Sequence, residues 1–201
     1  MRLEKASHKA IKYACLNFHY AKSIPNVGLG FSVFNDKNEW CGVICYGIGA
    51  TNNIAKPYDL NQGQVIELLR MALNGKQEST TKAMAISLKL IKKYAPNVKL
   101  IVSYADSEQG HIGIIYQATN WYYTGYSVDT NLIINGKREH RRTVGSRYGT
   151  CSAIKLQEAG HNVESIKTMP KWKYIYPIDK GLINLCKSLS KPYPKKQAVI
   201  A

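Results

Sequence analysis

The sequence contains 201 residues, enough to bury one sizeable core, and its hydrophobic fraction of 45% is ordinary for a globular protein. Lysine and arginine outnumber aspartate and glutamate 28 to 13, which gives a formal net charge of +15. No apolar run is long enough to span a membrane, and residues 1–14 lack the apolar segment of a secretory signal. The charge favours a polyanionic partner, most often nucleic acid, over an anionic membrane or a basic protein with no such partner.

The first part of the chain predicts a helix, a β-hairpin and a strand. Residues 4–23 start as a helix, because alanine and isoleucine recur there at helical spacing until Pro25 stops the run. Residues 27–49 contain two apolar strands around the turn cluster 35–38, which is the pattern of a hairpin. Residues 64–73 are dense in apolar side chains and predict a central strand.

Helices and strands alternate in the middle of the chain. Residues 74–97 predict a helix with Ser79 or Thr80 as its N-cap and an end near Pro96. The next predicted elements are a strand over 98–105, a short helix over 110–119 and a strand over 120–128.

The last third begins with the charged run 135–149, for which a solvated loop is the simplest interpretation. A helix that ends at Gly160 follows it. Strands over 163–168 and 171–178 and a helix within 180–190 complete the prediction. The order of elements predicts an α+β or mixed α/β fold with one central sheet, in a single domain over 1–190 with a basic tail over 191–201.

The five cysteines predict reduced thiols. Their number is odd and no C-x-x-C pair occurs, so we expect a cytosol-like compartment and no disulfide framework. Cys41 and Cys45 fall on one face of the second hairpin strand, where core packing explains both.

The order of elements resembles the fold of the GNAT acyltransferases. In that fold the fourth strand leads into a helix whose N-terminus cradles the cofactor pyrophosphate, and the fifth strand splays away from the fourth, in a mostly antiparallel sheet. GNAT proteins often carry a tyrosine followed four and five residues later by Gly-Phe, and here Tyr116 is followed by Asn120-Trp121. Their Arg-x-x-Gly-x-Gly/Ala loop is replaced by "NGKQESTTKAM", whose single glycine disfavours acetyl-CoA binding.

A narrower resemblance runs from about His19 to Asp179. The stretches "HYAKSIP", "SYADSEQGHIGIIYQATNWYYTG", "INGK", "HRRT", "SRYG" and "KWKYIYPID" are together similar to the Mom family of phage DNA-modification proteins. This family is a divergent GNAT branch associated with iron. It converts the adenine N6 amino group of DNA to a carbamoylmethyl form, which shields phage DNA from host restriction. The resemblance implies the same activity here, in the cytoplasm of a host bacterium, with a donor that the sequence does not identify.

The resemblance assigns catalytic roles to His19, Tyr20, Asp106 and Tyr116. In GNAT enzymes the matching tyrosine is a proton donor. Each residue also has a structural interpretation: His19 as a satisfied structural histidine, Asp106 as the N-cap of the next helix, and Tyr116 as a packed ring. His19, Asp106 and Tyr116 are the expected iron ligands, although the His-x-Asp spacing of a facial triad is absent. His111 is either a further ligand or an exposed loop histidine.

Three further residues are candidates for binding the cofactor. Arg70 places a charge inside a predicted central strand, which is costly unless the charge is paired or faces a cleft. It is therefore either a partner of Glu67 or an anion-binding group in the active cleft, and we favour the cleft. Ser79 and Thr80 are the other candidates, because they begin the helix that follows the degenerate pyrophosphate loop.

A basic cluster and a neighbouring aromatic strand predict contact with double-stranded DNA. The cluster consists of Lys137, Arg138, Arg141, Arg142 and Arg147, which we expect to contact phosphates. Residues 121–123 alternate between the two faces of a strand, so one face is core while the other, to which we assign Trp121, stacks on an adenine turned out of the duplex. The oligomeric state stays open, with a homodimer as one option.

Two other functions compete with DNA modification. One is acetyl-CoA-dependent N-acetylation of a nucleic acid, a protein or a small amine, which the degenerate loop disfavours. The other is DNA binding without catalysis on a GNAT scaffold, which leaves the block from Asp106 to Tyr116 unexplained.

Overall fold

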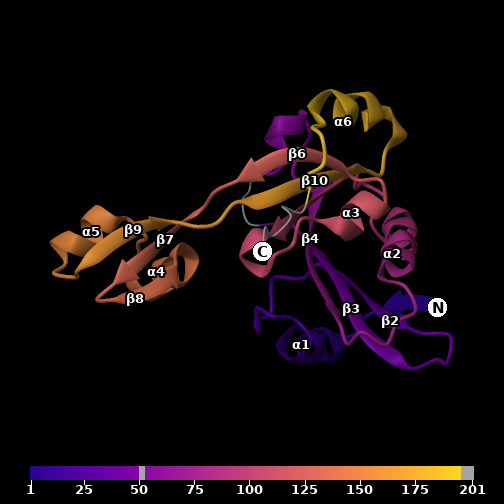
Figure 1. Cartoon of the computed structure of the whole chain (residues 1–201), viewed down its shortest axis with the longest axis horizontal. Coiled ribbons are helices and arrows are strands. Elements are labelled where there is room, and N and C mark those ends of the chain that lie inside the picture. Colours follow the sequence, from indigo (N-terminus) through magenta and orange to yellow (C-terminus); the bar gives the residue numbers. More distant parts are fainter. Residues whose placement is uncertain (50–52, 196–201) are drawn as a thin grey trace, which may run out of the picture. The chain divides into compact units, whose positions relative to one another are not determined.

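The computed structural model describes residues 1–49 and 53–195 and divides the chain into two compact units (Figure 1). The larger unit comprises residues 1–105 and 112–125 and the chain from Lys173 onward. The smaller unit comprises residues 106–111 and 126–172. The larger unit is therefore assembled from three separate stretches of sequence.

The larger unit is built on a seven-stranded sheet with the strand order β1-β2-β3-β4-β5-β10-β6. The strands are β1 (Arg2–Lys5), β2 (Leu29–Phe34), β3 (Trp40–Gly47), β4 (Val65–Leu73), β5 (Leu100–Asp106), β6 (Tyr122–Ser127) and β10 (Lys171–Pro177). Strands β1 to β4 pair antiparallel with their neighbours, whereas β4 and β5 run parallel. The sheet is mixed and mostly antiparallel, as predicted, and β4 lies at its centre.

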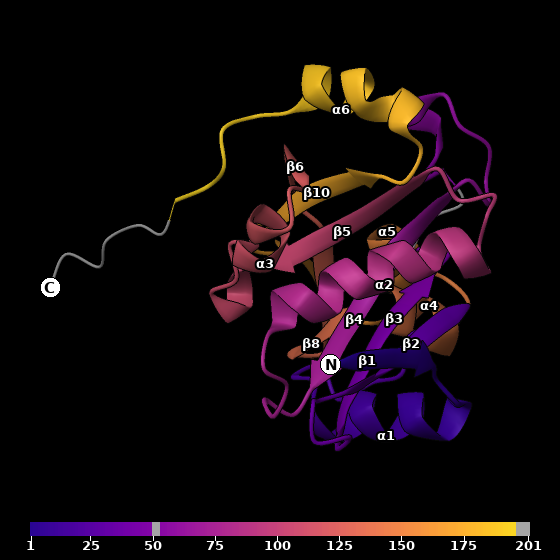
Figure 2. The ribbon, with the colours of Figure 1, turned by 90° about the vertical axis from the view of Figure 1, so that its right-hand side faces the viewer.

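Two helices lie on opposite faces of this sheet (Figures 1 and 2). The faces can be told apart along β3, because successive strand residues point to opposite sides. Cys45 packs in a cluster with α1 (His8–Asn17). Tyr46, the next residue, places its hydroxyl 2.6 Å from Oγ of Ser87 on α2 (Thr80–Tyr94). The apolar stripe of each helix therefore faces a different side of the same strands.

The predicted helices of the larger unit are present, but the first begins at His8 and not at residue 4, because Arg2–Lys5 pairs with β2 as strand β1. Ser79 caps α2 by accepting a hydrogen bond of 3.1 Å from the backbone N–H of Lys82, and the helix ends two residues before Pro96. Two short helices, α3 (Ile114–Ala118) and α6 (Ile183–Leu189), also lie where they were predicted. The 3₁₀ turns are η1 (Lys56–Tyr58), η2 (Ser107–Gln109) and η3 (Lys180–Leu182).

Strands β4 and β5 separate along their length, as predicted. Their parallel register joins only three residue pairs, from Val65 with Leu100 to Glu67 with Val102, although β5 continues to Asp106. Beyond the last pair, strand-to-strand pairing gives way to side-chain contacts. Such a splay opens a gap in the sheet where buried side chains can approach backbone groups.

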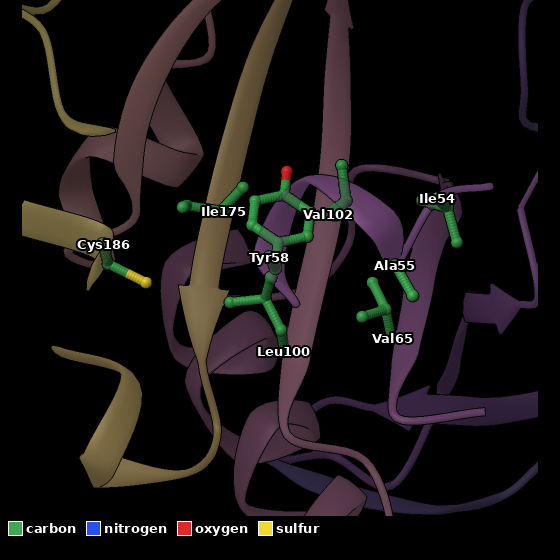
Figure 3. Packing of buried hydrophobic residues seen from close by; sticks show 8 residues of the cluster. All are labelled: Ile54, Ala55, Tyr58, Val65, Leu100, Val102, Ile175 and Cys186. Atoms are coloured by element: carbon green, nitrogen blue, oxygen red, sulfur yellow. The ribbon is translucent and has the colours of Figure 1, made fainter. Parts of the chain in front are cut away.

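A second apolar cluster holds the two strands together at the paired end (Figure 3). Figure 3 shows the ring of Tyr58, from η1, beside Leu100 and Val102 of β5 and Ile175 of β10. These side chains are almost completely removed from water. Burial at this end therefore fixes the strands from which the splay begins.

The smaller unit has a sheet and a core of its own. Its strand order is β8-β7-β9, and β7 pairs antiparallel with both neighbours. Its elements are β7 (Thr130–Ile134), β8 (Lys137–His140), α4 (Arg141–Tyr148), α5 (Ala153–Glu158) and β9 (Val163–Lys167). The core comprises Leu132, Ile134, Val144, Leu156 and Val163. The solvated loop considered as an alternative for the run 135–149 is excluded, because this run forms β8 and α4.

The described part of the predicted tail contacts the larger unit. The backbone N–H of Lys191 donates to the carbonyl of Tyr123 at 2.8 Å, and the hydroxyl of Tyr193 donates to the carbonyl of Trp121 at 2.7 Å. Residues 196–201 lie outside the described residues. The limits predicted for domain and tail stay a prediction.

The cysteines fit the expectation of reduced core thiols. Each of the five is free, and Cys151 alone among them is half-buried rather than buried. Across the described residues, none of the helices has the length and apolar character required to cross a membrane.

Candidate functional site

Tyr116 of α3 is the best-supported candidate for a catalytic side chain. Its hydroxyl lies 2.8 Å from Oγ of Ser103, a fully buried residue of β5 just beyond the paired part of the strand. Oγ of Ser103 also lies 3.1 Å from the carbonyl oxygen of Leu68 on β4. The ring of Tyr116 packs between Trp121 and Tyr174, with centroid distances of 5.1 and 5.0 Å. The phenol is therefore held on both faces and at its hydroxyl.

The start of α3 is fitted closely against Tyr174 of β10. The hydroxyl of Tyr174 donates to the carbonyl of Ile112 at 2.6 Å and receives a hydrogen bond of 3.1 Å from Nε2 of Gln117. Gly113 follows Ile112 in the chain and lies against the ring of Tyr174. Its φ is +81°, a conformation that favours glycine. A Cβ added at Gly113 would lie 2.6 Å from Cζ of Tyr174. This position therefore has room only for glycine, and the helix that carries Tyr116 depends on it.

The surroundings of Tyr116 keep its phenol protonated. Burial raises the pKa of Tyr116, because the phenolate cannot be solvated there. The hydrogen bond with Ser103 lowers this pKa in part, and the negative charge of Glu67 raises it again. The net shift is upward from the ordinary value of 10. Tyr116 is thus suited to donate a proton.

His19 and Tyr20 follow the end of α1. Their rings lie 4.3 Å apart between centroids, and the backbone N–H of Ala21 donates to Nδ1 of His19 at 3.1 Å. Because Nδ1 accepts this hydrogen bond, the neutral imidazole carries its proton on Nε2. Tyr20 is 45% exposed. The predicted approach of these two residues to Tyr116 stays a prediction.

Asp106 ends β5 and belongs to the smaller unit. Its carboxylate accepts a hydrogen bond of 3.1 Å from the backbone N–H of Glu108, which makes it the N-cap of η2. Asp106 is thus an N-cap, as considered from the sequence, but of the turn η2 and not of the helix α3 that follows it. His111 is exposed, and its backbone N–H donates to the carbonyl of Asp106 at 3.1 Å. The convergence of Asp106 with Tyr116 stays a prediction.

The expected iron ligands are His19, Asp106 and Tyr116. Within residues 1–49 and 53–195, no three His, Cys, Asp or Glu side chains are grouped as a metal ion requires. Of the three expected ligands, His19 offers Nδ1 to a backbone N–H and Tyr116 remains a phenol. A set made of one histidine, one aspartate and one tyrosine is outside that grouping, so iron binding by these three residues stays a prediction and no chemical step below is assigned to iron.

The three predicted cofactor-binding residues have partners inside the fold. Arg70 pairs in register with Cys45, its Nη1 donates to the carbonyl of Leu69 at 2.8 Å, and its buried Nε has no partner. Ser79 caps α2, and the hydroxyl of Thr80 accepts a hydrogen bond of 2.9 Å from Nε2 of Gln77. Cofactor binding by these residues stays a prediction.

Arg70 also influences two buried thiols on the α1 side of the sheet. A hydrogen bond with Cys45 lowers the pKa of Cys15 to about 7. Burial raises this pKa in part, and the positive charge of Arg70 lowers it further. Burial and the same hydrogen bond raise the pKa of Cys45. The guanidinium therefore lies close to the core of α1.

Several side chains of the basic cluster form ion pairs or hydrogen bonds within the smaller unit. Arg147 forms an ion pair of 2.6 Å with Glu139, whose side chain is 7% exposed. Arg138 pairs with Glu108 at 2.8 Å, and this contact lowers the pKa of the carboxyl group. Nη2 of Arg141 donates to the carbonyl of Cys151 at 3.0 Å. Lys137 is 74% exposed, with its Nζ 3.9 Å from Oε1 of Glu139, and the side chain of Arg142 lies outside the described part.

The expectation that Trp121 stacks on a base is wrong in this structure. Its side chain is fully buried, with its ring 5.1 Å from that of Tyr116 and 5.5 Å from that of Tyr176. The predicted alternation of residues 121–123 is confirmed, but Trp121 and Tyr123 occupy the core face and Tyr122 the opposite one. Trp121 therefore packs against Tyr116 in the core and is not available to stack on a base.

The sequence did not single out a groove on the larger unit. It has a volume of about 820 Å³ and lies along α2, the end of α3, the start of β6 and the end of β10. Its lysines are Lys82, Lys89, Lys92 and Lys180. The signal was present in the chain, because the first three recur within one arc of a predicted helix, outside its apolar stripe. Ser103 and Tyr174 were missed for lack of any such local signal.

Sequence comparison establishes the family. The chain belongs to the Mom protein family, which it matches over residues 1–195. It is 27% identical over 187 residues to a protein of Escherichia phage Mu named "Methylcarbamoylase mom", and the match covers 88% of this chain and 76% of that protein. The family predicted from the sequence is confirmed.

Solved structures establish the fold class. A dodecameric spermidine N-acetyltransferase from Vibrio cholerae aligns with a TM-score of 0.50 and 10% identity over 91% of this chain and 96% of that chain. A chimera of that enzyme with hSSAT aligns with a TM-score of 0.50 and 11% identity over 90% of this chain and 99% of that chain. The predicted GNAT N-acetyltransferase-like fold is confirmed.

Proposed function

We propose that this member of the Mom protein family modifies DNA by converting the N6 amino group of adenine to its carbamoylmethyl form. The family match over residues 1–195 carries the proposal, together with the 27% identity to a phage protein named as a methylcarbamoylase. The charge of +15 suits a polyanionic substrate. The product would shield phage DNA from host restriction inside the bacterial cytoplasm.

The reaction joins N6 of adenine to the methylene carbon of a carbamoylmethyl donor. As the new N–C bond forms, the bond between that carbon and the leaving group of the donor breaks, and the leaving group takes the electron pair. N6 loses one proton and the leaving group gains one. The donor is a molecule whose identity the chain does not reveal.

Tyr116 is assigned the proton transfer to the leaving group. Its phenol is protonated, buried, and fixed by Ser103, Trp121 and Tyr174. A buried acid of raised pKa gives up its proton only when a more basic partner develops, which happens as the leaving group departs. The carboxylate of Asp106 is assigned the proton of N6, and His19 and Tyr20 are assigned to position the substrate.

The adenine must leave the base stack before N6 can react. A base inside a duplex does not present its amino group to a pocket, so the enzyme has to turn the nucleotide out. The side chains Lys137, Arg138, Arg141, Arg142 and Arg147 are proposed to contact phosphates during this step. Lys137 is favourable among them, because its side chain is 74% exposed.

Nucleoside analysis of co-expressed plasmid tests the proposal. The plasmid is digested to nucleosides and examined by mass spectrometry, for the wild-type chain, Tyr116→Phe and the control Tyr13→Phe, whose ring is 54% exposed on α1. We expect a carbamoylmethylated deoxyadenosine in the wild type and the control, and its loss in Tyr116→Phe.

The same experiment separates the competing functions. An acetylated amine in nucleic acid, protein or small molecules with unmodified deoxyadenosine would support a conventional N-acetyltransferase. Unmodified nucleosides together with tight DNA binding would support a non-catalytic DNA-binding protein.

A further inference from the structure

The groove on the larger unit offers a row of cations to solvent. Lys82, Lys89 and Lys92 lie on α2, are all exposed, and line the groove together with Lys180 of η3. No aspartate or glutamate occurs among the described residues that line it. We call this surface, defined by the four lysines with Asn120, Tyr122 and Tyr176, the α2 groove.

The three helical lysines form an extended row instead of a compact cluster. At 1.5 Å of rise per residue, the row from Lys82 to Lys92 is about 15 Å long. At 3.6 residues per turn, the three side chains lie within an arc of about 80°. Packing does not require these charges, because α2 buries the opposite stripe, which includes Met84 and Ile91. The row is free to serve a binding role.

The α2 groove lies next to the candidate proton donor. Tyr176, on its wall, packs 5.5 Å from Trp121, and Trp121 packs 5.1 Å from Tyr116. Thr119, the C-cap of the short helix that carries Tyr116, and Asn120, the next residue, also line the groove. Tyr176 on the wall of the groove is therefore linked to Tyr116 through one intervening ring, that of Trp121.

We propose that the α2 groove is a binding site for the phosphate backbone of DNA on the larger unit. This proposal rests on the proposed function, which supplies DNA as the substrate. Duplex DNA carries about one negative charge per 1.7 Å of its axis, so a row of about 15 Å faces several phosphates at once. A small phosphorylated ligand would instead be held by cations that converge on one point. The extended row and the absence of acids favour the polymer.

Fluorescence anisotropy with a labelled duplex tests this site. The test variant is the triple substitution Lys82→Gln, Lys89→Gln, Lys92→Gln. The matched control is Lys5→Gln, Lys9→Gln, Lys12→Gln, which removes three exposed charges from β1 and α1.

Both variants lose the same net charge, so long-range attraction falls equally and only local contact separates them. The α2 triple should bind every duplex roughly tenfold or more weakly near 0.1 M salt. Its slope of log affinity against log salt should be shallower by about three. The control should lose much less, and circular dichroism melts should show that all three proteins are folded. Equal losses in the two triples, or an unchanged slope in the α2 triple, would overturn the site.

Plasmid modification distinguishes failure of this site from failure of the proposed function. If the wild type modifies adenine while the α2 triple binds DNA like the control, the function stands and the site is overturned. If the wild type binds DNA through the α2 groove but leaves all nucleosides unmodified, the site stands and the function is overturned. If the α2 triple loses modification with unchanged DNA affinity, the groove holds a small ligand and the inference is overturned.

A photocrosslink provides a readout that does not depend on affinity. Ala85 lines the α2 groove and is exposed, whereas Leu16 is exposed on α1. Ala85→p-benzoylphenylalanine should crosslink to DNA on irradiation, and Leu16→p-benzoylphenylalanine should not. Crosslinking at Leu16 alone would place DNA on the other face of the sheet.

Discussion

Replacing Ser103 with alanine removes the hydroxyl that joins β5 to the proposed proton donor. Ser103 is fully buried, so water does not take the place of the missing group. The change deprives the hydroxyl of Tyr116 and the carbonyl of Leu68 of a partner at 2.8 and 3.1 Å. Leaving buried polar groups unpaired costs about 1–3 kcal/mol, and alanine leaves almost no cavity. We expect the free energy of unfolding to fall by that amount.

Urea denaturation measures this loss, and a double-mutant cycle isolates the contact. The four proteins are the wild type, Ser103→Ala, Tyr116→Phe and the double variant. Because both single changes remove the same hydrogen bond, the double variant should be more stable than additivity predicts, by about 0.5–1.5 kcal/mol. The slope against urea should stay constant across the series. Additive effects would show that the two hydroxyls do not interact and would refute the reasoning.

Turnover separates positioning from simple stabilisation. Ser103→Ala should lower plasmid modification at saturating DNA by up to about tenfold, the kinetic equivalent of one hydrogen bond, with DNA affinity unchanged. Ser87→Ala is the control: Ser87 is equally buried and its hydroxyl lies 2.6 Å from that of Tyr46. It should lose comparable stability and keep its turnover. Equal turnover losses in both variants would reduce Ser103 to a structural residue.

Three further predictions concern individual contacts. Tyr116→Phe should reduce modification by roughly 10²–10⁴ while DNA affinity by anisotropy stays within twofold or so, and retained modification would remove Tyr116 from the chemistry. Gly113→Ala, at φ +81° and against the ring of Tyr174, should cost roughly 2 kcal/mol or more in urea unfolding, and a neutral result would contradict the close packing of α3. Arg138 lowers the pKa of Glu108, so their pair stabilises the fold above the ordinary value of 4.5 and stops doing so as pH falls through the lower folded value. The melting temperatures of wild type and Arg138→Ala should therefore differ near neutral pH and converge in acid, and a constant gap would exclude this linkage.

The elements with strong local signals were predictable from the sequence. The helix capped by Ser79 and stopped before Pro96 has an unbroken apolar stripe, so its limits follow from the chain alone. The smaller unit was not predictable, because its charged run obscures a short hairpin. Asn135 and Gly136 both have positive φ, which is the turn chemistry of a two-residue hairpin. The core of that unit draws on residues as distant as Leu132 and Val163, and pattern alone does not join them.

The candidate site was predictable only where a motif marked it. Tyr116 was identified by its match to the family. Ser103 and Tyr174 were not, because they reach Tyr116 only after β5 and β10 have become neighbours in the sheet. Alternation showed that one face around Tyr122 is core, but it did not show which one, and Trp121 was assigned to the wrong side. Contacts between strands decide such choices, and they arise only once the sheet has formed.

Burial separates two tasks in the larger unit. The phenol of Tyr116 and the hydroxyl of Ser103 are fixed by neighbours that salt does not screen, so their geometry and protonation are independent of how DNA arrives. The lysines of the α2 groove are exposed, so dissolved salt screens their attraction for phosphate. The screening becomes stronger as the salt concentration rises. High DNA concentration should therefore restore modification to lysine variants and leave Tyr116 variants inactive. The exposed positive charge thus serves to bind the duplex, and the buried tyrosine serves to protonate the leaving group once the adenine is in place.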